Sequence, residues 1–316
     1  MKVLVTGASG FVGNATCARL VMHGMHVIGT VRHQPARPLL GVDYRIVGDM
    51  DANTDWHDAY IGADAIIHCA ARVHVMRETA ADSLAAFRAV NVASTVPLAR
   101  QSAAAGVGRF IFLSSVKVNG EGGSIAYCET DPPAPQDAYS ISKYEAELGL
   151  REIATETGMH AVVVRSPLIY GPGVKANFQA LMRALVRGVP LPLGAIHNRR
   201  SMVALDNLVD LIAICIEHPA AASETFLVSD GEDLSTTELV RRLADAIGCP
   251  ARLVSVPEAV LMAGATLLGK REMARRLCGT LQVNGTKVRE VLGWAPPVSV
   301  DEGLRRTVEY YLQQQQ

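Results

Sequence analysis

Short runs of β-branched and other apolar residues alternate with segments of helical hydrophobic spacing through the first half of the chain. The short runs predict strands at Lys2–Thr6, Val27–Val31, Tyr44–Val47, Ala65–Cys69, Arg109–Ser114 and Ala161–Arg165. The helical spacing predicts helices at Gly13–His23, Ala85–Ala105 and Ala138–Glu156. Strands that alternate with helices form βαβ units. We therefore predict an α/β fold with a doubly wound parallel sheet and helices on both faces.

The alternation ends after Arg165, where a segment rich in proline and glycine begins. A predicted helix at Leu205–Glu217 and a predicted strand at Glu224–Val228 then resume the alternation of helices and strands seen before Arg165. The chain beyond Ser235 is predicted to be mostly helical. We predict one larger domain, formed by residues 1–166 and 203–230. A smaller, mostly helical lobe is formed by residues 167–202 and 231–316.

Composition narrows the functional classes. A length of 316 residues with 49% apolar residues suffices for such a two-part fold, and a net charge of −1 shows no bias towards nucleic acid. Six scattered cysteines without a Cys-x-x-Cys pair indicate reduced thiols in a cytoplasmic protein and no metal site. The apolar run after Lys2 is too short for a signal peptide. Val256–Leu268 is too short to span a membrane, and we predict a helix packed on a domain core, with a membrane-surface role as the alternative.

Glycines dominate the turn between the first strand and the first helix. Gly7, Gly10 and Gly13 follow the strand directly. Glycine allows a tight turn and close approach of the backbone to a pyrophosphate, which the free N–H groups of a helix start attract. We predict a dinucleotide site formed by these glycines with Phe11 and Val12. The larger domain is then a Rossmann-type dinucleotide-binding domain, and the lobe binds the substrate.

The end of the second strand bears on which dinucleotide is bound. Gly29–His33 contains no carboxylate that could bind the adenosine ribose, whereas Arg32 could bind a 2′-phosphate. We therefore favour NADP over NAD, and a solvated arginine is the alternative for Arg32. Asp49 and Met50 follow the third strand, where they could meet the adenine edge. An exposed turn is the other interpretation of this pair.

Tyr139 and Lys143 lie four residues apart in a predicted helix, so both can face a cofactor at the sheet edge. A nearby ammonium stabilises a phenolate, which predicts Tyr139 as a general acid and base. Ser115 follows the fifth strand, and its hydroxyl can orient a substrate oxygen. Together these residues predict proton transfer alongside hydride transfer.

The chain resembles the extended short-chain dehydrogenase/reductase family, which contains nucleotide-sugar epimerases, dehydratases and ketoreductases. The matching segments are Gly7–Gly13, Asp64–Ala71, Asn91–Thr95, Ser114–Ser115, Tyr139 with Lys143, Tyr170–Gly173 and Leu292–Pro296. The resemblance implies that Asn91 supports the lysine through water as a fourth catalytic residue. It also implies cofactor contacts by Ala70 and Ala71, and by Pro167 and Leu168 against the nicotinamide.

The resemblance further implies a UDP-sugar substrate in the lobe. Asn177 and Arg199 occupy the positions that bind the sugar and the diphosphate in family members, with Arg200 as an alternative to Arg199. Family members commonly form homodimers through two helices of each subunit. The corresponding segments are Ala85–Ala105 and Ala138–Glu156, so a homodimer is expected.

The residues after Ser115 separate reaction types within the family. Family dehydratases carry an Asp-Glu pair where this chain has Val116 and Lys117, which excludes dehydration. The chain is similar to a subgroup of the family that reduces UDP-N-acetyl-6-deoxy-4-keto-hexosamines. The shared features are Lys117 with Asn119 and Gly120, Arg72–Val75 and Leu281–Val283. We expect a 4-ketoreductase in which Tyr139 protonates the new alkoxide. A UDP-sugar 4-epimerase with retained NAD is the alternative, and a non-catalytic dinucleotide sensor is a third hypothesis.

Overall fold

The computed structural model describes residues 1–73 and 82–315. Within these residues, seven parallel strands form one sheet, in the order β3-β2-β1-β4-β5-β6-β9. In that order their bounds are Val42–Ile46, His26–Val31, Lys2–Thr6, Ala65–His68, Arg109–Ser115, His160–Ser166 and Thr225–Leu227. This confirms the predicted Rossmann-type sheet. The strand order reverses between β1 and β4, and such a switch point at the carboxyl edge is where ligands bind in open α/β sheets.

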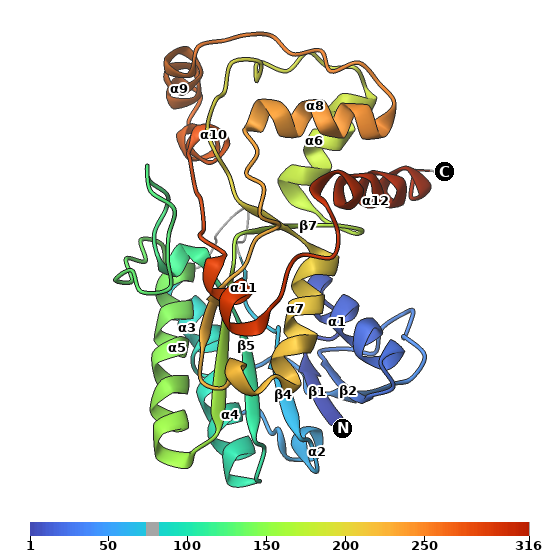
Figure 1. Cartoon of the computed structure of the whole chain (residues 1–316), viewed down its shortest axis with the longest axis vertical. Coiled ribbons are helices and arrows are strands. Elements are labelled where there is room, and N and C mark those ends of the chain that lie inside the picture. Colours follow the sequence, from blue (N-terminus) through green and yellow to red (C-terminus); the bar gives the residue numbers. More distant parts are fainter. Residues whose placement is uncertain (74–81, 316) are drawn as a thin grey trace.

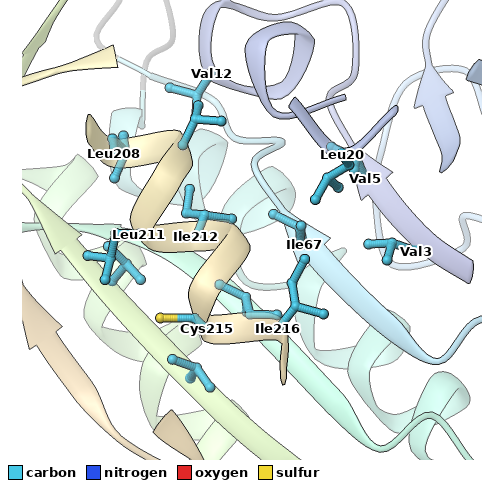
Figure 2. Packing of buried hydrophobic residues seen from close by; sticks show 14 of the residues in the cluster. Val3, Val5, Val12, Leu20, Ile67, Leu208, Leu211, Ile212, Cys215 and Ile216 are labelled. Carbon is cyan, nitrogen blue, oxygen red and sulfur yellow. The ribbon is translucent and has the colours of Figure 1, made fainter. Parts of the chain in front are cut away.

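Both faces of the sheet are buried, because successive side chains along a strand point to opposite sides. Val3 and Val5 pack in one core with α1 (Phe11–Met22) and α7 (Leu205–Glu217), as Figure 2 shows. Leu4 lies in a second core under α4 (Thr95–Ala104) and α5 (Ala138–Thr157). The remaining short helix of this domain, α2 (His57–Tyr60), packs in the same second core.

The predicted single helix over Ala85–Ala105 is wrong. The chain instead forms α3 (Ser83–Asn91) and α4, separated by a turn at residues 92–94. Pro97 lacks the N–H that would continue the helical ladder. In addition, the Ser94 and Thr95 hydroxyls donate to the carbonyl oxygens of Val90 and Asn91, at 2.5 and 2.8 Å. Such local hydroxyl bonds compete with the helical backbone.

The lobe lies beyond the carboxyl edge of the sheet (Figure 1). A parallel pair, β7 (Leu168–Tyr170) with β8 (Met202–Ala204), leads into it. Its helices are α6 (Ala176–Val186), α8 (Thr236–Ile247), α9 (Glu258–Leu267), α10 (Arg271–Cys278) and α12 (Val300–Gln313). A third apolar core holds α6, α8 and α12 together.

The division of the chain into two domains remains our proposal, and α11 (Thr286–Leu292) qualifies it. Val288 and Leu292 of this helix, and Trp294 after it, pack in the same core as α1 and α7. The chain therefore returns from the lobe to the sheet before α12. None of the helices in the described part of the chain is long and apolar enough to cross a membrane.

The segment Val256–Leu268 forms the predicted helix, α9, and it contacts a core at one residue only. No residue of α9 is buried, and Leu261 alone packs against the third core from one side. The surface that this helix presents is considered below.

Candidate active site

The glycine-rich turn has the geometry of an anion cradle. Gly7 adopts a φ of 66°, a left-handed conformation that favours glycine. A Cβ on Gly13 would lie only 2.2 Å from the Gly7 carbonyl oxygen, so no side chain fits there. Gly10 is the N-cap of α1, and no side chain caps the first N–H groups of that helix. The residues therefore fit a dinucleotide, whose pyrophosphate would be held by the N–H groups of Phe11, Val12 and Gly13.

The other predicted cofactor contacts lie at the same edge of the sheet as the glycine turn. The buried Ala70 packs on the turn so closely that a Cβ on Gly7 would lie 2.9 Å from its Cα, and Ala71 beside it is half-buried. Pro167 is buried at the end of β6, whereas the side chain of Leu168 is 45% exposed. An apolar surface therefore lies at the sheet edge where the nicotinamide ring is expected.

The predicted adenosine position, at the ends of β2 and β3, carries a cation paired with a carboxylate. Arg32 Nη1 lies 3.3 Å from Asp49 Oδ1, and both side chains are largely exposed. Met50 is half-buried against the second core. Arg32, the predicted 2′-phosphate ligand, is thus paired here with Asp49, because the chain after the third strand brings a carboxylate to the same place. An exposed pair of this kind is weak, so the arginine can exchange partners.

A buried histidine that we did not predict supports the same edge. His68 ends β4, and its Nε2 lies 2.9 Å from Thr95 Oγ1, which itself donates to the Asn91 carbonyl. Nε2 is therefore the donor, and Nδ1 accepts from Thr6 Oγ1 at 2.8 Å. Thr6 Oγ1 in turn accepts from the N–H of Ala70. Burial, and then the nearby lysine charge, lower the pKa of His68 to about 3. The ring is neutral and connects the first strand to α4.

Ser115 and Tyr139 meet at the carboxyl edge of β5. Tyr139 lies in the first turn of α5, which begins at a capping box formed by Asp137 and Ser140. Burial, followed by the Asp137 carboxylate, raises the pKa of Tyr139 to about 12, and a hydrogen bond with the Ser115 side chain opposes the rise. The phenol therefore starts protonated, with its oxygen beside a hydroxyl that can orient a substrate.

Lys143 lies one helical turn after Tyr139 and is 1% exposed. Its Nζ lies 3.9 Å from the centroid of the Phe112 ring on β5. Burial lowers the pKa of this lysine to about 7, whereas the Glu147 carboxylate acts in the opposite direction. The charge of Lys143 at neutral pH thus depends on a balance between desolvation and a carboxylate one further turn along α5.

That carboxylate belongs to a buried ion pair. Glu147 Oε2 accepts from Arg165 Nη2 on β6 at 2.6 Å, and both side chains are essentially inaccessible. Ser114 Oγ donates to Glu147 Oε1 at 2.5 Å, and Arg165 Nη1 donates to Asn119 Oδ1 at 3.0 Å. The pair connects the catalytic helix to two strands of the sheet.

Asn91 has a positioning role in this structure. Its Oδ1 accepts from the backbone N–H of Arg72 at 2.8 Å, and its Nδ2 donates to the Arg72 carbonyl. Nδ2 also donates to Ser142 Oγ at 2.9 Å. Asn91 thus ties the segment after β4 to the catalytic helix next to Lys143. His74 and Val75, in the segment similar to the ketoreductase subgroup, lie outside the described residues.

Lys117 follows Ser115 closely and binds two carboxylates. Its Nζ lies 2.6 Å from Asp137 Oδ2 and 2.9 Å from Glu121 Oε1. Burial raises the pKa of Asp137, but hydrogen bonds led by that of Lys117 outweigh it and the net shift is downwards. Lys117 therefore balances the negative charge nearest to Tyr139.

The two candidate substrate residues both have exposed side chains. Asn177 lies in the first turn of α6, after Ala176, whose φ of 55° is unusual for a residue with a side chain. The Arg199 side chain has no hydrogen-bond or ionic partner in residues 1–73 and 82–315, whereas Arg200 Nη1 donates to the carbonyls of Arg276 and Gly279. Of the two arginines, Arg199 is therefore the one available to a ligand.

The chain is similar to known nucleotide-sugar enzymes over nearly its whole length. A family model described as "NAD dependent epimerase/dehydratase family" matches residues 3–229. A UDP-glucose 4-epimerase from Vibrio cholerae is 43% identical over 315 residues, covering 99% of this chain and 96% of that protein.

Solved structures show the same fold. The UDP-glucose 4-epimerase of Thermotoga maritima, determined with UDP-glucose, aligns with a TM-score of 0.78 and 23% identity, covering 100% of both chains. A dTDP-glucose 4,6-dehydratase from Streptomyces venezuelae, determined with NAD, aligns with a TM-score of 0.79 and 27% identity, covering 100% of this chain and 98% of the other. With the cofactor turn and the Tyr139–Lys143 helix in place, this chain belongs to the NAD dependent epimerase/dehydratase family, within the extended short-chain dehydrogenases/reductases.

Proposed function

We propose that this protein is a UDP-sugar 4-epimerase that retains NAD. The observation that carries the proposal is the meeting of Ser115 and Tyr139 at the carboxyl edge of β5, one turn from Lys143. The glycine cradle follows β1 at the same edge of the sheet. The Vibrio cholerae relative, at 43% identity, supports the epimerase over the ketoreductase that we expected first.

The residues have separate roles in this reaction. When bound, NAD would accept a hydride from the carbon that bears the alcohol and return it to the opposite face of the resulting ketone after the sugar has turned, which inverts that carbon. Tyr139 Oη takes the proton from the C4 hydroxyl and gives a proton back to the C4 oxygen when the alcohol is formed again. Ser115 orients that oxygen. The N–H groups of the glycine turn hold the pyrophosphate of the cofactor.

Charge around Tyr139 must favour the phenolate during the first step. A pKa of about 12 in the structure is too high for a base at neutral pH. A protonated Lys143 and the positive nicotinamide both favour the phenolate, because opposite charges stabilise the ionised form. Lys117 acts in the same direction through the Asp137 carboxylate.

A 4-ketoreductase is the second candidate, and the position of Lys117 favours it. Lys117, with Asn119 and Gly120, is similar to the ketoreductase subgroup, and it is bound to Asp137 at the start of α5. A reductase exchanges its cofactor at each turnover, which would suit NADP bound by Arg32. A non-catalytic sensor has no need of the buried Lys143 and its supporting carboxylate, since desolvating them is costly.

The NADP alternative can be tested at Arg32 after any bound NAD has been removed from the protein. If Arg32 leaves Asp49 to bind a 2′-phosphate, Arg32→Ala should weaken NADP binding by roughly 1.5–3 kcal/mol, as expected for a charge-assisted hydrogen bond. NAD binding should barely change. Calorimetric titration with both cofactors measures this, with Arg45→Ala as the control. Equal changes for both cofactors would exclude a 2′-phosphate contact at Arg32.

The substrate proposal can be tested at Arg199. A diphosphate calls for a planar cation with several donors, and Arg199→Ala should raise the KM for a UDP-sugar about 10-fold or more. Cofactor affinity should stay unchanged. Arg241→Ala, which removes an exposed arginine of α8, is the control. If UDP fails to bind the wild-type protein in calorimetry at millimolar concentration, the substrate is not a UDP-sugar.

We also propose a homodimer through the segment Ala85–Ala105, which forms α3 and α4, and through α5. Arg88 and Glu145 already connect these helices through a bidentate pair, and the Leu148 side chain on α5 is 45% exposed. Sedimentation at micromolar concentration should give twice the chain mass of 33.7 kDa. A single species of monomer mass would contradict the dimer.

A further inference from the structure

The outer end of the lobe presents an apolar helix to solvent. α9 lies with α10 at the extremity of the lobe, far from the sheet (Figure 1). Ten residues long and almost wholly apolar, α9 has no buried residue. Val260 is 58% exposed, Leu267 89% and Leu268 73%. Contiguous apolar surface of this kind marks a site of interaction with a protein or a membrane.

Basic side chains border this apolar surface. Residues 270–276, which connect α9 to α10 and form most of α10, contain four basic side chains and one acidic one. Lys270, Arg271 and Arg275 are exposed. Ala274 and Cys278 of α10 are buried against the lobe, and the exposed Arg271 and Arg275 flank them along the helix. Arg275 Nη1 lies 3.4 Å from Glu272 Oε1, an exposed and therefore weak pair. The exposed cations thus belong to the same structural unit as the apolar helix.

We propose that α9 and α10 form a docking surface for a membrane whose outer layer carries anionic headgroups. Apolar side chains such as Leu267 and Leu268 would enter the boundary between headgroups and acyl chains, and the basic residues would lie among the headgroups. Each basic residue near an anionic surface contributes favourably to such binding. The chain as a whole has a net charge of −1, so the attraction is local to this end of the lobe.

A second copy of the chain is a poorer occupant for this surface. In a two-fold dimer the same patch meets itself. Lys270, Arg271 and Arg275 of one copy would then face the same cations of the other, and like charges across an interface are costly. An anionic lipid surface can bury the apolar side chains of α9 and also attract the basic side chains beside them.

The proposed surface is connected directly to the substrate segment. Asn198 Nδ2 donates to the carbonyls of Leu277 and Gly279, at the end of α10. Arg200 Nη1 donates to the Gly279 carbonyl as well. The main chain that bears Arg199 is thus anchored to the docking helix, so membrane binding would place the substrate site close to the lipid surface.

The test is cosedimentation of the full chain with sucrose-loaded vesicles. We expect binding to vesicles of 30% phosphatidylglycerol in phosphatidylcholine, little binding to pure phosphatidylcholine, and loss of binding at high salt. Leu267→Glu should weaken binding at least 10-fold, because a leucine would otherwise be buried in the interface. Arg271→Ser should weaken it about fivefold, the worth of one cation near an anionic surface.

Matched controls come from the loop between β2 and β3. Leu40 is 95% exposed there, and Arg37 is exposed too. Leu40→Glu and Arg37→Ser should leave vesicle binding unchanged, and all four variants should keep the wild-type melting temperature. The proposal is overturned if the wild-type chain does not bind anionic vesicles, or if Leu267→Glu binds like Leu40→Glu. It is also overturned if Leu267→Glu instead abolishes self-association without lipid.

Discussion

Replacing Tyr139 by phenylalanine is expected to lower kcat by about 10²- to 10⁴-fold, the usual weight of a general acid and base. The substitution removes only the hydroxyl, and the edge-to-face contact of the ring with Phe87 can remain. Dinucleotide binding should therefore change little. Steady-state kinetics with a UDP-sugar, together with the amount of NAD that heat releases from each protein, measures both quantities.

Tyr144→Phe is the matched control for this variant. Tyr144 lies on the same helix, next to Lys143, and loses the same hydroxyl. It should keep wild-type turnover. If Tyr139→Phe turns over as fast as Tyr144→Phe, the assignment of the acid and base is wrong.

Replacing Glu147 by leucine is expected to lower the free energy of unfolding by about 3–5 kcal/mol, because the buried Arg165 is left without its carboxylate. Glu145→Leu is the control, since Glu145 pairs with Arg88 at the surface of the same helix. Exposed pairs of this kind are worth at most about 1 kcal/mol. Urea unfolding at neutral pH measures the difference.

A double variant distinguishes the loss of the ion pair from a general packing defect. Glu147→Leu with Arg165→Leu removes both charges, and it should recover part of the stability that the single variant loses. If Glu147→Leu and Glu145→Leu destabilise the protein equally, the buried pair has no special role in holding α5 on the sheet.

The strands were the most predictable part of the fold. β1 has the predicted bounds, and β6 extends the prediction by one residue at each end. In both cases a short apolar run has both faces buried, so the pattern alone defines the strand. The break between α3 and α4 was not predicted, because the spacing of apolar residues continues across it. Pro97 was the available signal.

Those parts of the candidate site that depend on a sequence motif, with particular residues at fixed spacing, could be predicted. The glycine turn and the Tyr139–Lys143 pair each require particular residues at fixed spacing. His68 and the pair of Glu147 with Arg165 were missed, because a single polar residue in an apolar run does not reveal its partner. A charged residue such as Arg165 inside a buried strand nevertheless requires one. Glu147, one turn after Lys143, was the candidate partner for Arg165.

The epimerase proposal is tested most directly by incubating the purified protein with UDP-glucose and no added cofactor, followed by NMR of the sugar. The account predicts that UDP-galactose forms until the two epimers reach equilibrium, and that heat releases NAD from the protein. Tyr139→Phe should abolish the conversion while the NAD stays bound. Absence of the epimer, together with stoichiometric oxidation of NADPH by a UDP-4-keto-sugar, would contradict the epimerase and establish the ketoreductase in its place.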